Sequence, residues 1–178
     1  NKLALKNLSR LEPKPAALIP ELLKMLNDLD PIKRKLACQT LGTFKDLPKE
    51  IVPELTKALH DSDQNVIDSA IDALGHFGKH SLEAVPQIKK ILKKGDAQSK
   101  ISAAVALARI DSKGAQDMEP LIELLQDHSA LHRENVVLAL RHFPQYAAMT
   151  VPALAKAALG DPDEIVGISA AEAIGSMF

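Results

Sequence analysis

Apolar residues recur along this chain at steps of three and four residues, the period of one buried face of an α-helix. In residues 53–78 the pattern runs twice, and the short polar stretch Asp61-Ser62-Asp63 separates the two runs. A short polar side chain at that place can accept the amide hydrogens that open a second helix, and Gly78 stands where this helix would end. The stretch therefore predicts two amphipathic helices joined by a tight turn.

The same unit recurs along the chain with a period close to 33 residues. A proline of the first helix returns at steps of 33, 33, 34 and 32 residues, as Pro20, Pro53, Pro86, Pro120 and Pro152. A polar residue at the start of the second helix returns at steps of 33, 33, 33 and 34 residues, as Asp30, Asp63, Asp96, Ser129 and Asp163. A small or β-branched residue inside the second helix keeps a similar spacing, as Ala37, Ala70, Ala103, Val136 and Ala170. Three sets of positions with one period predict a solenoid of stacked helix pairs.

We therefore expect an all-α fold, an α-α superhelix of about five helix pairs in a single domain over residues 1–178. Residues 1–12 are interpreted as the end of a preceding repeat, which would give a partial N-terminal helix. The whole repeats are placed at 13–46, 47–79, 80–112, 113–145 and 146–178.

Two helices are expected in each repeat. The first helices are predicted at 15–27, 49–60, 82–93, 115–126 and 147–159, and the second helices at 31–44, 64–77, 97–110, 130–143 and 163–177. Asp30-Pro31 and Asp161-Pro162 are each interpreted as a capping acid followed by a proline in the first helical turn. Pro53, Pro86 and Pro152 are expected to lie inside their helices.

The turn and the second helix resemble HEAT repeats, in particular the short repeats of the phycobilin-lyase type. The residues that carry the resemblance read DSDQNV at 61–66 and DPDEIV at 161–166, followed by ALG at 73–75 and AIG at 173–175. The resemblance implies that the first helices form a convex side and that the second helices line a concave groove. It also implies a role in binding proteins, as a scaffold or as an accessory domain.

HEAT repeats often carry an arginine directly after the valine of this motif. Here that place is taken by Arg34, Ile67, Lys100, Arg133 and Gly167. A ladder of arginines bonded to the aspartates of the turns is therefore expected to be incomplete.

Composition and charge narrow the class of partner. The formal net charge is −1, aromatic residues make up 3% of the chain, and tryptophan is absent. Nucleic-acid binding usually needs a basic stripe and often stacking aromatics, so nucleic acid is not expected. No apolar run is long enough to cross a bilayer, so no membrane partner is expected. The single cysteine, Cys38, excludes an internal disulfide and is interpreted as a small core residue.

The exposed face of the second helices is the expected binding surface for a protein or peptide. The candidate residues on it are Asp68, Asp72, Ile101, Val105, Arg109, Glu134, Leu138 and His142. The apolar members either anchor a partner or pack between neighbouring helices, and the sequence leaves both interpretations open. Asp68 and Asp72 lie one helical turn apart, but nothing near them in sequence would separate their pKa values for acid–base catalysis. A solvated acidic face is the favoured interpretation of this pair. As a hypothesis, Asp68, Asp72 and Glu134 select a basic partner that Ile101, Val105 and Leu138 anchor.

The histidine pairs and the sequence motifs predict neither a metal site nor a catalytic or cofactor-binding site. His76 and His80 are separated by Gly78, and His128 and His132 flank a turn, so no metal site is expected. No catalytic or cofactor-binding motif is present, and no cofactor is expected.

Four lysines, Lys89, Lys90, Lys93 and Lys94, gather on one predicted first helix. They would either bind an anionic partner or form a solvated surface, and the solvated surface is the favoured interpretation.

The sequence thus favours a non-enzymatic scaffold that binds a protein or peptide along its second helices. The alternative is an accessory or structural HEAT module of an enzyme, either a lyase-like subunit or an appendage to a catalytic domain. Nucleic-acid binding is a third hypothesis and predicts affinity that falls steeply with salt. A monomer is expected, with end-to-end stacking of the apolar ends as an alternative. The chain opens with Asn1 and is interpreted as a fragment; without a visible targeting segment the cytoplasm is only a default compartment.

Overall fold

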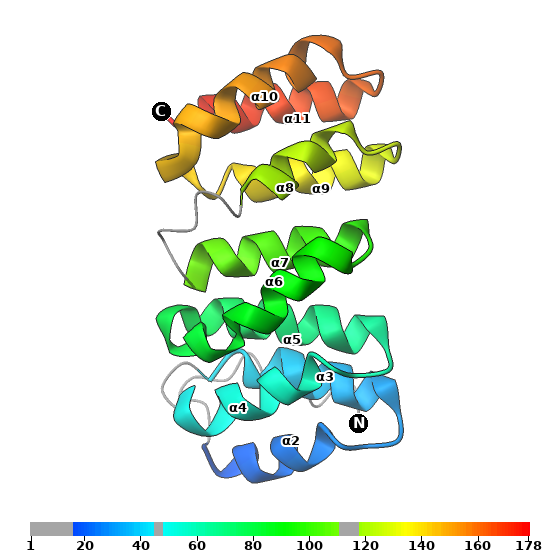
Figure 1. Cartoon of the computed structure of the whole chain (residues 1–178), viewed down its shortest axis with the longest axis vertical. Helices are drawn as coiled ribbons and strands as arrows, with labels where there is room; N and C mark the ends of the chain where they lie inside the picture. Colours follow the sequence, from blue (N-terminus) through cyan, green and yellow to red (C-terminus); the bar gives the residue numbers. More distant parts are fainter. Residues whose placement is uncertain (1–15, 45–47, 111–117) are drawn as a thin grey trace.

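The computed structural model describes residues 16–44, 48–110 and 118–178, and within these ranges the chain is helical and contains no strand. The helix pairs are stacked along one axis, so that the first helices form one layer and the second helices form another beside it (Figure 1). The first-helix layer contains α2 (Ile19–Met25), α4 (Pro48–Ala58), α6 (Val85–Lys94), α8 (Glu119–Glu123) and α10 (Ala147–Gly160). The second-helix layer contains α3 (Pro31–Leu41), α5 (Gln64–Phe77), α7 (Ala97–Ile110), α9 (Ala130–Leu140) and α11 (Glu164–Gly175). The predicted all-α solenoid is confirmed.

Short 3-10 helices extend several of these elements. They are η1 (Ala16–Leu18), η2 (Gly78–Ala84), η4 (Leu124–Gln126) and η5 (Pro144–Tyr146). The partial helix predicted within residues 1–12 lies outside the described residues, and the boundaries between repeats stay a prediction.

Capping side chains fix the starts of the second helices as the turn sequence predicts. The carboxylate of Asp63 accepts a hydrogen bond from the amide of Asn65 at 2.9 Å, and Asp30 accepts one from Ile32 at 2.8 Å. Gly78, with φ +53°, ends α5 in a conformation that favours glycine. The contacts of Asp63 and Gly78 explain why the predicted bounds 64–77 agree with α5. α7 agrees with its prediction at 97–110, and Asp96 accepts a hydrogen bond there from the amide of Ser99 at 2.8 Å.

One proline differs from the prediction. Pro53 and Pro152 lie inside α4 and α10 as predicted, but Pro86 stands in the first turn of α6. The predicted helix at 82–93 therefore begins only at Val85 and follows a 3-10 stretch. The first turn tolerates proline because its amide hydrogen has no partner there in any case.

The prediction that Asp161 caps the last helix is wrong. α11 begins at Glu164, and its cap is Asp163, whose carboxylate accepts hydrogen bonds from Ile165 and Val166 at 3.0 and 3.3 Å. Asp161 is free to contact the preceding repeat. Of the first helix predicted at 115–126, residues 115–117 lie outside the described residues, and the rest contains α8 (Glu119–Glu123) followed by η4.

Small residues let neighbouring second helices pack closely. A Cβ atom built on Gly42, at the end of α3, would lie 2.7 Å from the Cβ atom of Ala73 in α5. One built on Gly75 would lie 3.1 Å from the Cα atom of Ala106 in α7. Neighbouring first helices touch each other much less than neighbouring second helices do. We therefore take the closely packed second-helix layer as the inner side of the superhelix.

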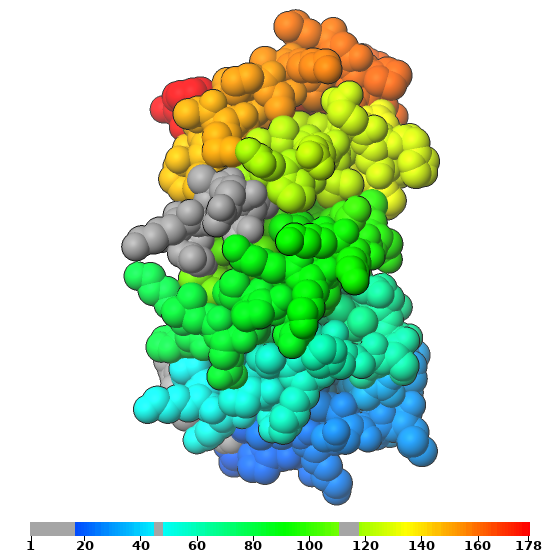
Figure 2. Space-filling view, in the orientation of Figure 1, coloured from blue at the N-terminus to red at the C-terminus, as the bar shows by residue number. Residues whose placement is uncertain are grey.

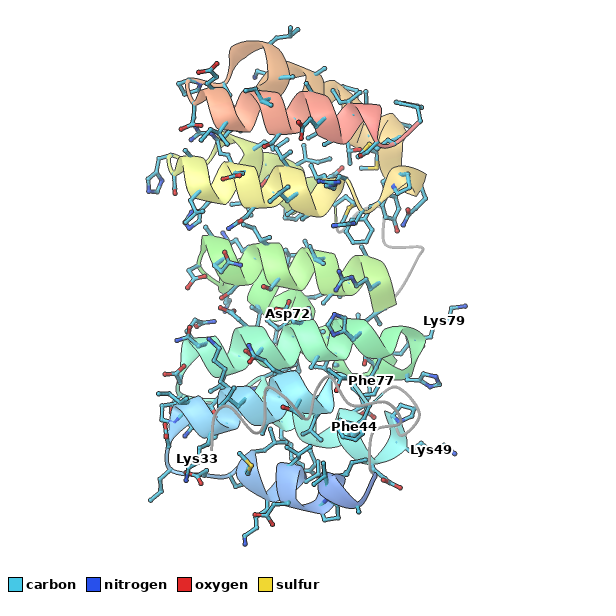
Figure 3. The ribbon with its side chains drawn as sticks, turned by 180° about the vertical axis from the view of Figure 1, so that it is seen from behind. Lys33, Phe44, Lys49, Asp72, Phe77 and Lys79 are labelled. Carbon is cyan, nitrogen blue, oxygen red and sulfur yellow. The ribbon has the colours of Figure 1, made fainter. Side chains whose placement is uncertain are left out.

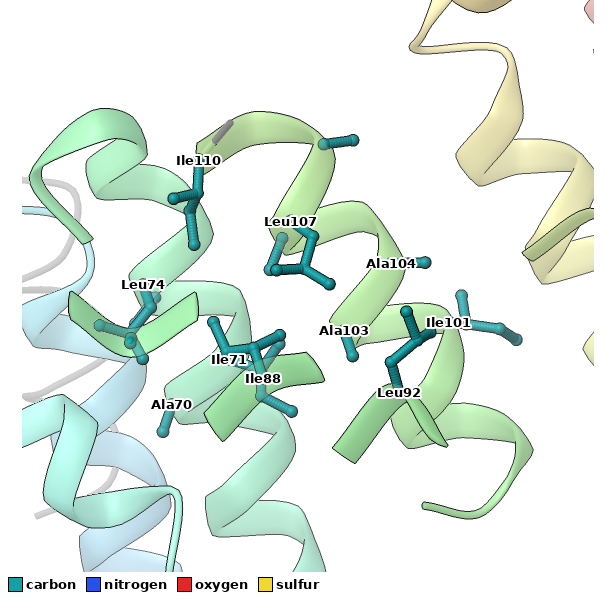
Figure 4. Packing of buried hydrophobic residues seen from close by; sticks show 14 of the residues in the cluster. Ala70, Ile71, Leu74, Ile88, Leu92, Ile101, Ala103, Ala104, Leu107 and Ile110 are labelled. Carbon is teal, nitrogen blue, oxygen red and sulfur yellow. The ribbon is translucent and has the colours of Figure 1, made fainter. Parts of the chain in front are cut away.

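The core lies between the two layers and runs the length of the stack. Figure 4 shows a section of it, where Leu74 of α5, Ile88 of α6 and Leu107 of α7 meet; all three are fully buried. Each repeat thus buries its apolar face against its neighbours, as expected of a solenoid.

Two arginine–aspartate pairs join neighbouring repeats at the turns. Arg34 donates to both carboxylate oxygens of Asp61 at 2.7 Å, and Arg133 donates to both oxygens of Asp161 at 2.7 and 2.8 Å. Each arginine also donates to a backbone carbonyl of its own turn, that of Asp28 or Asp127. The ladder is incomplete as predicted, since Ile67 and Lys100 hold the corresponding positions in the repeats between.

Gly42→Ala should destabilise the fold by about 1–3 kcal/mol, because the new methyl group meets the backbone of Ala73 and the helices must separate. Gly175→Ala is the matched control: nothing lies within 4 Å of its Cβ position, so it should be neutral or stabilising by about 0.5 kcal/mol. Urea unfolding followed by circular dichroism measures both. Equal stability of the two variants would contradict the close-packing argument.

Arg133→Met should cost roughly 2 kcal/mol of stability at neutral pH, because it leaves the buried Asp161 carboxylate without its partner. Hydrogen bonds from Arg133 lower the pKa of Asp161. A lowered pKa gives stability that is complete above the ordinary aspartate pKa of about 3.9 and is lost as the pH falls through the folded-state value. The difference between wild type and variant should therefore shrink in acid.

Thermal unfolding between pH 7 and pH 2.5 measures this difference. Arg141→Met, at an exposed position, is the control and should match wild type at each pH. A deficit of the Arg133 variant that stays constant down to pH 2.5 would rule out the ion pair as its cause.

Candidate functional site

The second-helix layer presents one continuous face, on which Asp72 of α5 lies near the middle (Figure 3). The structure brings the predicted site residues to three neighbouring helices. Asp68 and Asp72 are on α5, Ile101, Val105 and Arg109 on α7, and Glu134 and Leu138 on α9. His142 follows α9 in an exposed turn.

Asp68 is held by a polar contact between α5 and α7. Ser99 donates its hydroxyl hydrogen to Asp68 Oδ1 at 2.7 Å, and Gln64 Nε2 donates to Ser99 Oγ, also at 2.7 Å. Ser99 is fully buried, whereas Asp68 is half-buried. The carboxylate is thus oriented by the neighbouring repeat and keeps part of its surface for a ligand.

Asp72 lies one turn further along α5 and is the more exposed of the two acids. Desolvation by the adjoining helices raises the pKa of its carboxyl group; Arg109 opposes this shift, Asp68 adds to it, and a hydrogen bond from Ser102 also opposes it. The surroundings of Asp72 therefore do perturb its pKa, which the sequence did not predict. Burial is the largest cause, and the two groups that oppose it, Arg109 and Ser102, lie on α7, about one repeat away in sequence.

The apolar candidates divide into buried and accessible side chains. Ile101 is only 5% exposed and belongs to the core, so packing is the better account of this residue. Val105 is half-buried against the core, and Leu138 is 39% exposed. Val105 and Leu138 therefore remain the accessible apolar groups between the acids of α5 and Glu134 of α9.

Sequence reasoning missed the buried serines that arrange this face. Ser102 is 6% exposed and acts on Asp72, while Ser99 bonds Asp68. A polar residue recurs directly before the small or β-branched residue of the second helix, as Ser69, Ser102, Asn135 and Ser169. This recurrence is a signal that could have identified Ser102. No serine recurs at the position of Ser99 in the other repeats, so the sequence offered no such signal for this residue.

Other reactive groups are accounted for by packing or by turn contacts. Cys38 is fully buried, and this burial raises the pKa of its thiol to about 12. His132 Nδ1 lies 3.0 Å from Asp127 Oδ1, and His128 Nδ1 lies 3.6 Å from the same oxygen. Over residues 16–44, 48–110 and 118–178 no group of three metal-ligating side chains gathers at one place.

None of the described helices is long and apolar enough to cross a membrane.

Comparison with known proteins places the chain by family and fold. A family model described as HEAT repeats matches residues 19–108 and, again, residues 85–175. A search of curated proteins gives no match.

Among solved structures, the chain is similar to the complex of CpcE and CpcF of phycocyanin lyase from Nostoc sp. PCC7120, with TM-score 0.64 and 22% identity over 93% of this chain and 67% of that one. It is also similar to a designed armadillo repeat protein in complex with peptide (KR)4, with TM-score 0.60 and 21% identity over 99% and 92% of the two chains. Likeness at these identities shows the fold alone.

Arg109→Gln should raise the pKa of Asp72 further, because the guanidinium favours the ionised carboxylate and its removal leaves desolvation less opposed. Titration of the Asp72 carboxyl carbon by NMR measures the shift. Arg141→Gln, in the exposed turn after α9, is the control and should leave the Asp72 titration unchanged. A pKa of Asp72 that falls or stays constant in the Arg109 variant would show that the two side chains do not interact.

Proposed function

The chain belongs to the HEAT-repeat family, and from this premise we propose that it is a non-enzymatic scaffold that binds an extended basic peptide across α5, α7 and α9. The observation that carries the proposal is the pair of accessible carboxylates, Asp68 and Asp72, with buried serines of α7 beside both of them. A positioned acidic group needs little reordering when it meets a cation, which lowers the cost of binding.

The apolar groups beside these acids supply a second element of recognition. Val105 and Leu138 lie on α7 and α9, next to Glu134, and offer contact for the aliphatic stem of a lysine or arginine. A bound basic peptide would thus contact the carboxylates with its charged groups and the apolar side chains with the aliphatic stems of its lysines or arginines. The likeness to a designed repeat protein solved with peptide (KR)4 supports basic peptides as the first class to test.

Asp68→Lys combined with Asp72→Lys should weaken binding of a fluorescein-labelled (KR)4 peptide by tenfold or more, which corresponds to about 1.4 kcal/mol or more of binding free energy. Fluorescence anisotropy with the whole chain measures the affinity. Binding should also weaken on acidification, because a raised pKa lets Asp72 lose its charge earlier than an ordinary aspartate.

The matched control is Glu83→Lys combined with Glu123→Lys, which makes the same change of charge at exposed positions of η2 and α8. This variant should bind within about threefold of wild type, since distant surface charges are screened by salt. Equal losses in the two double variants would indicate unspecific attraction. An unchanged affinity of the Asp68 and Asp72 variant would move the site away from this face.

An accessory role beside an enzyme is the second hypothesis, and the likeness to the phycocyanin lyase complex is compatible with it. The likeness is one of fold. A bound bilin that colours the protein purified from its source would favour this second role, and a colourless protein that binds (KR)4 through Asp68 and Asp72 would favour the scaffold.

A further inference from the structure

Three grooves between neighbouring repeats open along the edge that carries the turns. One lies between the turn after α4, α5 and α6, a second between α6, α7, α8 and η4, and a third between η4, α9 and α10 with their turns. They occupy equivalent places in successive repeats, so their linings can be compared position by position. Their volumes are about 310, 380 and 370 Å³.

The charges of the second and third grooves are balanced within each lining. The second groove contains Lys93 and Lys100, opposed by Glu123 and Asp127. The third contains Arg133 and Lys156, opposed by Asp127 and Asp161, and Arg133 and Asp161 are bonded to each other. Neither lining carries an excess of formal charge when histidine is neutral.

The first groove lies between the second and third repeats. It differs from the other two grooves in its formal charge and in the apolar side chains that form its floor. Its lining contains Lys90 and Lys94 and no aspartate or glutamate. Lys94 stands at the place of Asp161, and Ile67 at the place of Arg133, so the ion pair of the third groove is replaced by a lysine and an apolar side chain. Leu59 and Ile91 complete an apolar floor beside Ile67.

The lysines of this groove are available to a ligand. Both Lys90 and Lys94 are exposed, and among the described residues no ion pair engages either one. The comparison with the preceding repeat is informative: Lys57, at the place of Lys90, bonds Glu54 at 2.6 Å. In α6 the residue at the place of Glu54 is Gln87, which carries no charge.

We propose that this groove binds an acidic protein segment that inserts an aliphatic side chain onto Leu59, Ile67 and Ile91 while its carboxylates meet Lys90 and Lys94. α4 and α6 lie on the face shown in Figure 2, and the groove opens at the edge beside it, between the turn that follows α4, the start of α5, and α6. Its volume is at the lower end of the range for ligand pockets and suits one or two side chains.

The floor decides between a protein segment and a nucleic acid. Binding of single-stranded nucleic acid rests on aromatic side chains that stack with bases, and the lining contains no Phe, Tyr or Trp. An apolar floor instead favours a ligand that buries an aliphatic group there. The lysines at the rim attract a ligand of opposite charge and raise its association rate. In this proposal two of the four lysines of α6, Lys90 and Lys94, meet the ligand.

The test uses the whole chain and a fluorescein-labelled peptide, Asp-Asp-Leu-Glu-Asp, with the peptide Asp-Asp-Asn-Glu-Asp as its apolar control. Fluorescence anisotropy should show saturable binding of the leucine peptide, at least about tenfold tighter than the asparagine peptide. The methyl NMR signals of Ile67 and Ile91 should shift on binding. Lys90→Glu combined with Lys94→Glu should weaken binding about tenfold or more.

Two further variants separate this groove from general attraction. Lys49→Glu combined with Lys156→Glu makes the same change of charge at exposed positions of α4 and α10 outside this groove and should weaken binding less than about threefold. Ile67→Arg combined with Lys94→Asp recreates the residues of the third groove and should abolish binding while the thermal stability stays equal or rises.

Several results would overturn the proposal. They are the absence of saturable binding, equal affinity for the two peptides, and equal losses in the two lysine variants. Methyl shifts that leave out Ile67 and Ile91 would also overturn it. Binding of a single-stranded oligonucleotide that the Lys90 and Lys94 variant loses, without any preference for the leucine peptide, would replace the protein segment with a phosphate ligand.

Discussion

The whole structure depends on the close approach of successive second helices. A helix pair cannot bury its apolar face alone, so each repeat must press that face against the next one. Gly42 against Ala73 and Gly75 against Ala106 make this approach possible, because any larger side chain would hold the helices apart. The corresponding position in α7 is Ala108, and α7 and α9 are in less extensive contact than α5 and α7. The contacts of α3 with α5 and of α5 with α7 thus each depend on one glycine, whereas Arg141 stands at this position at the end of α9, which still packs against α11.

The edge that carries the turns is under a weaker constraint, and the chain varies there. An arginine bonded to the aspartate of the next turn joins the first repeat to the second and the fourth to the fifth. Between the second and third repeats the core contacts remain, but Ile67 and Lys94 take the places of the two partners. Loss of the pair costs little there because both partners are replaced together and neither charge is left buried and unpaired. Because the core contacts hold the repeats together, the side chains at this edge can differ between repeats with little loss of stability.

Most of the fold could be predicted because one period repeats in several kinds of residue at once. Caps such as Asp63 and the end at Gly78 are local signals, so α5 agreed with its prediction. Asp161 was misassigned because a turn aspartate beside a proline looks the same whether it caps a helix or pairs with an arginine 28 residues away. Ile101 looked like a surface residue for a similar reason, since its burial is decided by neighbouring helices. Ser99 and its contact with Asp68 depend on the register between two repeats, and no local pattern encodes that register.

The two proposed sites share one helix and face different ways. Ile67 and Asp68 are neighbours in α5, yet Ile67 lines the groove with α6 and the turn after α4 while Asp68 is bonded by Ser99 of α7. The net charge of −1 gives no sign of these two local sites of opposite charge. A solenoid allows such separation, since its layers expose long surfaces of independent composition. Because α5 is held by close contacts to both α3 and α7, a ligand on one face has little freedom to move it. The two proposed sites nevertheless share Gln64, which lines the groove and donates to Ser99 Oγ and Asp68 Oδ1, so any coupling between them would pass through that side chain and not through movement of the helix.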